Sequence, residues 1–365
     1  MSPGRRQEAR QDQDPPPKGA KPHGGQGGET PNGGGAPDRG AGRSLAGPAT
    51  PKRGTTESAP DPRGGRGGPP PHKERETLQT SATVLTVRRV QDYHALTLVA
   101  PAIAERFRPG QFVALAVGGE HTSRLVRRCF GVYEVKSDYG GTVELVFADR
   151  EPGTAWLAGR RSRDQLDLVG PLGRPFRLPR DPVSCLLAGG GPGGAALFAL
   201  ADTLHRRGCQ VHFLLGGPSA RQVFGSRMAQ RIGDSATVTT EDGSLGEKAT
   251  VRDVMPRVIE ETGADVVYAC GPTPLLRAVT QVASEHGLPS QVSVESFLQE
   301  TGACGIGVCM TCILPMHGDD GLTRMVRACA DGPVLRGDRV RWGDLGTIPF
   351  DALGAPRVLT EGGPR

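Results

Sequence analysis

The chain has 365 residues, with 54 Gly, 32 Pro and 8 Cys, a hydrophobic share of 36% and a net charge of +5. This length allows two or three domains. No 18-residue apolar run and no apolar N-terminal segment occur, so we expect no membrane-spanning helix, no secretory signal and a cytoplasmic protein.

Residues 1–78 differ in composition from the rest of the chain. They contain 17 Gly and 14 Pro, and their only large apolar residues are Met1, Leu45 and Leu78. Such a segment cannot bury enough apolar surface to offset its chain entropy, so we expect a disordered tail. It carries 13 Lys or Arg, 9 Asp or Glu and no aromatic residue. This mixture favours a solubilising extension over a nucleic-acid contact.

Residues 79–180 are predicted to form a small antiparallel β-barrel. Apolar and polar residues alternate there in short runs, and turn residues such as Pro109-Gly110 and Gly140-Gly141 separate the runs. Strands at this spacing are typical of a barrel. The runs cover residues 83–87, 93–99, 111–117, 131–135 and 142–147.

Residues 181–290 are predicted to form an α/β domain with a parallel sheet. Apolar runs at 183–188, 210–215, 236–240 and 265–269 alternate with helical stretches. A glycine-rich loop, residues 189–194, follows the first run and precedes a helix. Glycines at that place let a pyrophosphate approach the helix N-terminus, although a purely structural turn remains the alternative.

Residues 291–350 contain a compact cysteine motif, and residues 351–365 form a C-terminal tail. The motif has the spacing C-x4-C-x2-C-x16-C and consists of Cys304, Cys309, Cys312 and Cys329. Thiolates are soft ligands that suit a [2Fe–2S] cluster, and the two glycines of the loop let backbone N–H groups approach its sulfides. Four-cysteine zinc is the rival, but it usually shows two C-x2-C pairs. The other four cysteines are scattered, as in a reducing compartment.

Further motifs stand in a fixed order along residues 80–345. They are Arg128-Cys129-Phe130-Gly131, Gly153-Thr154, Gly170-Pro171-Leu172-Gly173, the loop 189–194, and Cys270-Gly271-Pro272. In this order they resemble the ferredoxin–NADP reductase superfamily of flavoproteins. The cysteine segments 303–312 and 327–335, with the segment 241–246, narrow the resemblance to the electron-transfer subunits of type B dihydroorotate dehydrogenases.

The resemblance implies a fold of several domains: an FAD-binding β-barrel, a nucleotide-binding α/β domain and a small [2Fe–2S] domain. It implies that Arg128, Gly153 and Thr154 hold the FAD pyrophosphate and that Phe130 lies against the isoalloxazine. Cys129 and Gly131 belong to the same FAD motif. The implied NAD(P) site consists of Gly189, Gly191, Gly193, Cys270, Gly271 and Pro272.

The implied catalytic positions are Cys270, beside the nicotinamide, and Gly131, beside the flavin. At position 131 the superfamily usually carries Ser or Thr, whose hydroxyl binds the reactive flavin nitrogen, so this chain departs from the pattern. NAD and NADP are not distinguished, because Ser219 and Arg221 are suited either to a 2′-phosphate or to a simple turn.

The resemblance also implies a partner. Electrons would come from dihydroorotate through FMN in a separate catalytic subunit, in a heterotetramer that serves pyrimidine biosynthesis, and would pass the cluster and FAD to NAD. Two alternatives stay open. One is a NAD(P)H reductase that acts alone or in another complex, and the other is a non-catalytic scaffold with vestigial cofactor sites.

Overall fold

The computed structural model describes residues 77–119 and 126–355. Within these residues it confirms the predicted fold class: an antiparallel barrel, an α/β sheet and a small region around the cysteine motif. The predicted disordered tail lies outside the described residues except for residues 77 and 78, and the predicted C-terminal tail is described only to residue 355. Among the helices of the described part, none is long and apolar enough to cross a membrane.

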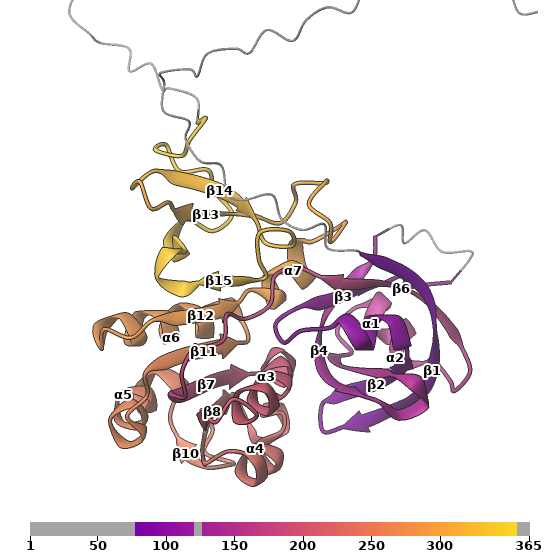
Figure 1. Cartoon of the computed structure of the whole chain (residues 1–365), viewed down its shortest axis with the longest axis horizontal. Helices are drawn as coiled ribbons and strands as arrows, with labels where there is room; N and C mark the ends of the chain where they lie inside the picture. Colours follow the sequence, from indigo (N-terminus) through magenta and orange to yellow (C-terminus); the bar gives the residue numbers. More distant parts are fainter. Residues whose placement is uncertain (1–76, 120–125, 356–365) are drawn as a thin grey trace, which may run out of the picture. The chain divides into compact units, whose positions relative to one another are not determined.

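Six antiparallel strands close into a barrel in the order β1-β2-β5-β4-β3-β6 (Figure 1). The strands are β1 (Leu78–Val90), β2 (Tyr93–Val99), β3 (Phe112–Leu115), β4 (Arg128–Lys136), β5 (Thr142–Ala148) and β6 (Gln165–Leu172). Two short helices, α1 (Pro101–Arg106) and α2 (Pro152–Ala158), lie in the connections. Because successive strand residues point to opposite faces, alternate side chains fill the barrel with aliphatic and aromatic groups.

Strand β6 closes the barrel by pairing with both β1 and β3. The sequence analysis gives residues 170–173 only as one of its motifs and predicts no strand there, whereas residues 170–172 are the end of β6. The alternation of Leu166 and Leu168 with polar residues is the strand signal, since both leucines are buried in the barrel. The Gly-Pro pair obscured it, because such pairs usually mark turns.

Seven strands form the second sheet, in the order β10-β9-β8-β7-β11-β12-β15. The strands are β7 (Ser184–Gly190), β8 (Gln210–Gly217), β9 (Ser235–Thr240), β10 (Glu247–Lys248), β11 (Val266–Cys270), β12 (Ser290–Ser293) and β15 (Val334–Arg336). All neighbours are parallel except β12 and β15. Every residue of β7 is buried, as expected for a central strand covered on both faces.

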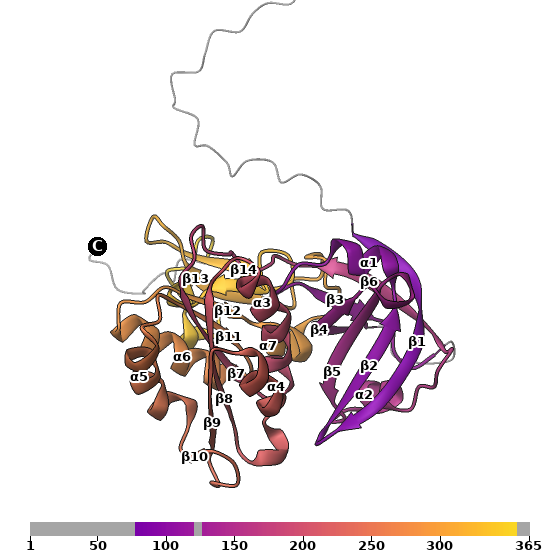
Figure 2. The same ribbon diagram turned by 60° about the horizontal axis from the view of Figure 1, so that its bottom comes forward.

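Four helices cover the two faces of this sheet (Figure 2). They are α3 (Ala196–His205), α4 (Ser226–Ile232), α5 (Val251–Thr262) and α6 (Thr273–Glu285). Helices α3 and α4 share one buried core with the sheet and with barrel residues Tyr93 and Tyr133. Helices α5 and α6 share the core of the opposite face.

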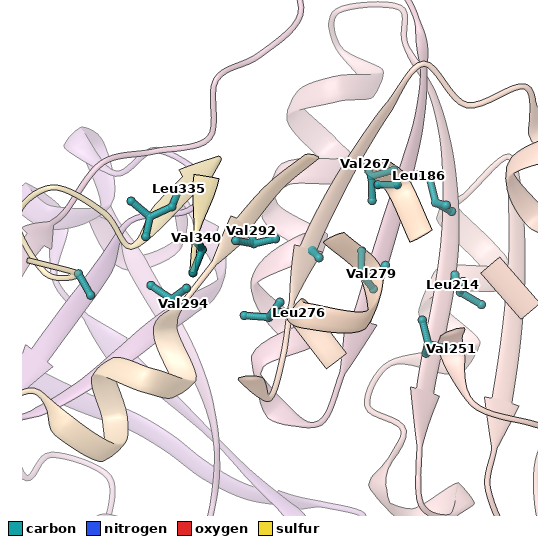
Figure 3. Close-up of a cluster of buried hydrophobic side chains, with 14 of the residues drawn as sticks. Leu186, Leu214, Val251, Val267, Leu276, Val279, Val292, Val294, Leu335 and Val340 are labelled. Atoms are coloured by element: carbon teal, nitrogen blue, oxygen red, sulfur yellow. The ribbon is translucent and has the colours of Figure 1, made fainter. Parts of the chain in front are cut away.

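The region with the cysteine motif is continuous with the sheet. It contains α7 (Glu295–Thr301) and an antiparallel pair, β13 (Ile313–His317) and β14 (Thr323–Arg327). The sequence separates this region from the α/β domain near residue 290, yet β12 and β15 both join the sheet. Figure 3 shows the shared core passing from Leu214 along the sheet to Val292, Leu335 and Val340. Cys312 and Cys329 belong to the same core.

Candidate functional site

The loop after α7 carries three cysteines of the motif and wraps its backbone around one of their sulfurs. Gly305 and Gly307 have φ angles of 72° and 85°, which residues with side chains rarely adopt. These bends aim three backbone N–H groups at the Cys304 Sγ atom. The donors are Ile306, Val308 and Cys309, at N···S distances of 3.4, 3.3 and 3.4 Å. Such donors stabilise a thiolate bound to iron and tune the cluster potential.

The four cysteines of the motif lie as two pairs. The Cys329 thiol hydrogen-bonds to Cys312 and lowers the pKa of Cys312 to about 6. Thr311, and to a smaller extent Cys304, lower the pKa of Cys309 to about 6. In residues 77–119 and 126–355, no three His, Cys, Asp or Glu side chains gather closely enough to hold one metal ion. Two thiol pairs suit two irons bridged by sulfide.

Strand β4 turns three successive odd-numbered residues away from the barrel, and each meets a different neighbour. Cys129 lies at the cysteine loop, where a Cβ at Gly305 would be 3.7 Å from its sulfur. Gly131 lies against Glu295. Tyr133 packs edge-on against a ring of α3, with 5.6 Å between the ring centroids. One strand therefore connects the predicted flavin motif with the cysteine loop and the α/β sheet.

Phe130 points the other way, into the barrel. Its ring is 2% exposed and lies 5.6 Å from that of Phe147, between centroids. This burial gives Phe130 a packing role in the barrel core, which the alternation along β4 requires. Contact between Phe130 and an isoalloxazine therefore stays a prediction from the resemblance.

Arg128 lies beside the start of α2, where Gly153 and Thr154 are found. A Cβ at Gly153 would be 3.6 Å from Arg128 Nε, so the arginine side chain packs directly beside this first turn of the helix. The guanidinium donates to both carboxylate oxygens of Glu151. The Thr154 hydroxyl donates to the Glu151 carbonyl and accepts from the Arg150 and Glu151 backbone N–H groups. The structure thus brings the three predicted pyrophosphate residues together, with Glu151 as an acidic neighbour that the sequence analysis missed.

Glu295 is a second functional candidate that the sequence analysis missed. This carboxyl opens α7, is 6% exposed, and accepts hydrogen bonds at Oε1 from the Gly131 N–H at 2.6 Å and the Gln299 side chain at 2.7 Å. Burial raises its pKa to about 7 despite those two bonds. The thiols of Cys129 and Cys270 face the same carboxyl, and burial raises the pKa of both.

The carboxyl ends of β7, β8, β9 and β11 surround a cavity of about 470 Å³. Gly191 lines it with a φ of 59°, a conformation that favours glycine. Pro272 and the N-terminus of α5 line it as well. The α5 N-terminus is fixed by a reciprocal cap in which Thr250 and Asp253 bond each other's backbone N–H. Such strand ends are where α/β sheets bind ligands.

The other predicted nucleotide residues are buried beneath this cavity. A Cβ at Gly189 would be 2.9 Å from the Leu215 side chain of β8 and 3.1 Å from that of Leu197 of α3, so this glycine permits close packing of β7 against both elements. A Cβ at Gly193 would be 3.2 Å from the Gly271 backbone, so these two segments touch directly. Cys270 is 1% exposed at the end of β11. These residues shape the edge that carries the cavity.

Residues absent from the prediction also line the cavity. They are Tyr93, Arg150, Gln222, Glu241 and Arg252, among others. Glu241 stands at the carboxyl end of β9, which a search of all strand ends for charged residues would have found. Arg221 does not line the cavity, because Asp92 holds its guanidinium at 2.6 and 2.8 Å. A further cavity of about 560 Å³, between α1, β4 and α3, is lined by none of the predicted residues.

Known proteins are similar both to the cysteine region and to most of the whole chain. A family model described as the iron–sulfur cluster binding domain of dihydroorotate dehydrogenase B matches residues 300–341. The chain is 34% identical over 263 residues to the electron transfer subunit of dihydroorotate dehydrogenase B (NAD(+)) from Geobacillus thermodenitrificans, covering 71% of this chain and 96% of that one. It is 33% identical to the Desulforamulus reducens protein of the same description, covering 67% and 90%.

A solved structure is also similar over most of the described chain. It is an NADH-dependent reduced ferredoxin-NADP oxidoreductase, with a TM-score of 0.63 and 28% sequence identity, and the match covers 73% of this chain and 91% of that one. The similarity extends over both the barrel and the α/β sheet, since neither alone reaches that coverage.

Proposed function

Because the chain belongs to the family of electron-transfer subunits of dihydroorotate dehydrogenase B, we propose that it carries electrons from a catalytic partner subunit to NAD⁺. It is an oxidoreductase subunit, and its cofactors are FAD, an iron–sulfur cluster and NAD(P). The observation that carries the proposal is the position of β4, which contacts the cysteine loop through Cys129 and contains the FAD motif.

The [2Fe–2S] cluster is held by Cys304, Cys309, Cys312 and Cys329. The donor set supports this assignment, since all four are cysteines without a disulfide and three N–H groups already point at the Cys304 sulfur. The protein's contribution is to hold the thiols in two pairs and to bury Cys312 and Cys329 in the core. Burial and N–H donors set the potential of such a cluster.

Electrons reach the cluster at an apolar surface of the cysteine loop. Ile306, Val308 and Met310 are 54%, 75% and 50% exposed, and we call them the cluster-loop patch. Apolar side chains gathered around a redox centre mark a place where a partner protein docks. The partner that fits is the FMN-containing catalytic subunit that oxidises dihydroorotate, in a heterotetramer with this chain.

FAD is held at β4 and α2. Arg128 supplies charge-assisted hydrogen bonds to the pyrophosphate, and Gly153 lets the phosphate approach the helix. When bound, FAD accepts electrons singly and releases them as a pair, which joins cluster chemistry to hydride chemistry. The residues of the chain determine the path of the electrons from the cluster to FAD. Cys129 and Gly305 bring the strand of the FAD motif into contact with the cysteine loop.

NAD⁺ occupies the cavity at the strand ends. The glycine loop and the α5 N-terminus present backbone N–H groups for the pyrophosphate. Pro272 lines the cavity and follows the buried Cys270, which faces Glu295. Hydride transfer needs close contact between the two reacting rings. The closeness of Cys270 to Glu295, which itself contacts the β4 flavin motif, supports that arrangement.

An absorption spectrum and a reconstituted reaction test the proposal. Anaerobically purified full-length chain should show flavin bands and a broad [2Fe–2S] absorption, with two irons per chain. Mixed with an FMN-containing dihydroorotate dehydrogenase subunit from the same source, it should reduce NAD⁺ with dihydroorotate. A colourless protein contradicts the proposal. A coloured protein that reduces acceptors with NAD(P)H but never couples to dihydroorotate favours a reductase of another complex.

A further inference from the structure

One peptide group of the cysteine loop makes a hydrogen bond at each of its two polar atoms. It is the peptide that joins Gly307 to Val308. The Val308 N–H donates to the Cys304 sulfur at an N···S distance of 3.3 Å, and the Gly307 carbonyl accepts from the Arg327 guanidinium at an N···O distance of 3.4 Å. A single amide therefore joins a cation to one of the four proposed cluster ligands.

Glycine at position 307 makes the approach of the arginine possible. Its φ of 85° favours glycine, and a Cβ there would be 2.9 Å from the Ala330 side chain and 3.4 Å from Arg327 Nη1. Its own backbone N–H donates to Cys329. Gly307 therefore contacts the second half of the cysteine motif, and the Arg327 side chain packs against it.

Asp331 holds the Arg327 side chain in this place. Its carboxylate accepts from the Arg327 backbone N–H at 3.0 Å and from the Arg327 Nε at 3.1 Å. Arg174 lies 3.6 Å from the same carboxylate. The side chains of Arg327 and Asp331 are 40% and 30% exposed, so water screens their charges only in part. The guanidinium is thus oriented beside the cysteine loop before any partner binds.

The charge of Arg327 bears on the electron that the cluster receives. The thiolates and sulfides of such a cluster outweigh the charge of its irons, so reduction adds negative charge to an anion. A nearby cation stabilises the added charge and raises the reduction potential. The bond from Arg327 to the Gly307 carbonyl also polarises the amide, which makes the Val308 N–H a stronger donor to Cys304.

We propose that Arg327 is a positioning residue that raises the reduction potential of the cluster, and that the negative charge of Asp331 opposes this effect. The inference rests on the proposed function and adds to it the residues that determine how readily the cluster takes an electron from the partner subunit. The step is the transfer of one electron with no proton. Because an arginine side chain stays protonated, its contribution does not depend on pH.

The decisive measurement is the midpoint potential of the cluster in the full-length chain loaded with FAD and cluster, followed by electron paramagnetic resonance during a reductive titration. Arg327→Met keeps much of the aliphatic stem but removes the charge and the donor. Its one-electron reduction equilibrium should shift about tenfold toward the oxidised cluster, which corresponds to a potential about 59 mV lower. Arg327→Lys restores the charge without the planar fork and should recover part of this shift.

Asp331→Asn gives a prediction of the opposite sign. Asparagine keeps an oxygen that can accept from the Arg327 backbone N–H, but it removes the negative charge beside the cluster loop. The potential of this variant should therefore rise above that of the wild type.

Arg324→Met is the matched control. Arg324 lies on the same strand, β14, is 41% exposed and pairs with an aspartate four positions away, as Arg327 does. Its guanidinium bonds Asp320, in the turn between β13 and β14, at 2.5 and 2.6 Å. This variant should keep the wild-type cluster potential. The FAD potential in Arg327→Met should also be unchanged, since the proposed FAD residues lie on β4 and α2.

A purely structural role predicts a different pattern. If Arg327 and Asp331 only kept the loop in shape, Arg327→Met and Asp331→Asn would shift the potential in the same direction or lose iron together, and either result would overturn the proposal. An unchanged potential in Arg327→Met would overturn it as well. The proposed function fails by a separate observation, which is a wild-type chain that binds neither flavin nor iron–sulfur cluster.

Discussion

The Arg128 guanidinium lies against Glu151 and donates to both of its carboxylate oxygens, at 2.5 and 2.8 Å. The arginine is the predicted pyrophosphate ligand, and the glutamate precedes the helix that carries Gly153 and Thr154. The ion pair holds the Arg128 guanidinium in one orientation beside the start of α2. Less side-chain conformational entropy is therefore lost when a phosphate binds. A bound phosphate must therefore share the Arg128 guanidinium with the Glu151 carboxylate.

Replacing Arg128 by Ala should weaken FAD binding by one to two orders of magnitude, because charge-assisted hydrogen bonds contribute about 1.5–3 kcal/mol. The measurement is an equilibrium titration of flavin-free chain with FAD. Arg127→Ala is the matched control, since that guanidinium bonds Asp167 on β6 instead. Equal loss in both variants would mean that overall charge, rather than the position of Arg128, governs FAD affinity.

Glu241 should make the chain prefer NADH to NADPH. Its carboxylate stands at the cavity edge, where a 2′-hydroxyl can donate to it and a 2′-phosphate is repelled. Glu241→Ser should raise kcat/KM for NADPH about tenfold and lower it for NADH, measured by flavin reduction. Arg221→Ala should leave the ratio of the two unchanged, because Asp92 engages that arginine away from the cavity. If Arg221→Ala changed this ratio, the turn after β8 rather than Glu241 would determine the preference between NADH and NADPH.

The parts of the site that could be predicted are those with local spacing. The four cysteines and the glycine loop could be predicted from the sequence. The geometry of a cluster fixes the spacing of its cysteines, and a tight turn fixes the spacing of its glycines, within one segment of the chain. The barrel and the parallel sheet follow in the same way from periods of two and from buried apolar runs. Each of these signals lies within one short stretch of the chain.

The parts that could not be predicted depend on distant contacts. Gly131 and Glu295 are 164 positions apart in the sequence. No local pattern near either residue predicts that the Glu295 carboxyl fills the space that a side chain at position 131 would occupy. The antiparallel addition of β15 to the sheet depends on pairing with β12, which no local pattern specifies. The inward turn of Phe130 follows from the register of β4 in the closed barrel.

Cys312→Ser should abolish the [2Fe–2S] absorption, because a serine hydroxyl is a poor ligand for iron beside sulfide. Iron and acid-labile sulfide content should fall to background while FAD remains bound. Cys209→Ser makes the same chemical change in the buried core of the α/β sheet and should keep two irons per chain. Stoichiometric zinc in the wild-type chain after anaerobic purification would contradict the cluster assignment.

Val308→Asp should disrupt docking of the catalytic partner subunit without loss of the cluster. The side chain is 75% exposed in the cluster-loop patch, so the change leaves the fold intact but places a charge in an apolar interface. Affinity for the partner should fall at least tenfold by calorimetry, with unchanged cluster absorption. Tyr139→Asp alters a residue of the barrel region that is 71% exposed and should bind as the wild type does. Wild-type affinity of Val308→Asp would move the docking surface elsewhere.

Glu295 should make the stability of the chain fall as pH rises from about 5 to 8. Burial raises its pKa from 4.5 to about 7, so in this range the folded state holds a proton that the unfolded state has released, and raising the pH favours unfolding. Glu295→Gln removes this dependence, and its advantage over the wild type should grow by the order of 3 kcal/mol between pH 5 and pH 8. Urea unfolding of both proteins at the two pH values measures this difference, in which all other titrations cancel. A constant difference between them would mean that the carboxyl titrates at its ordinary pKa and that its burial does not favour the protonated form.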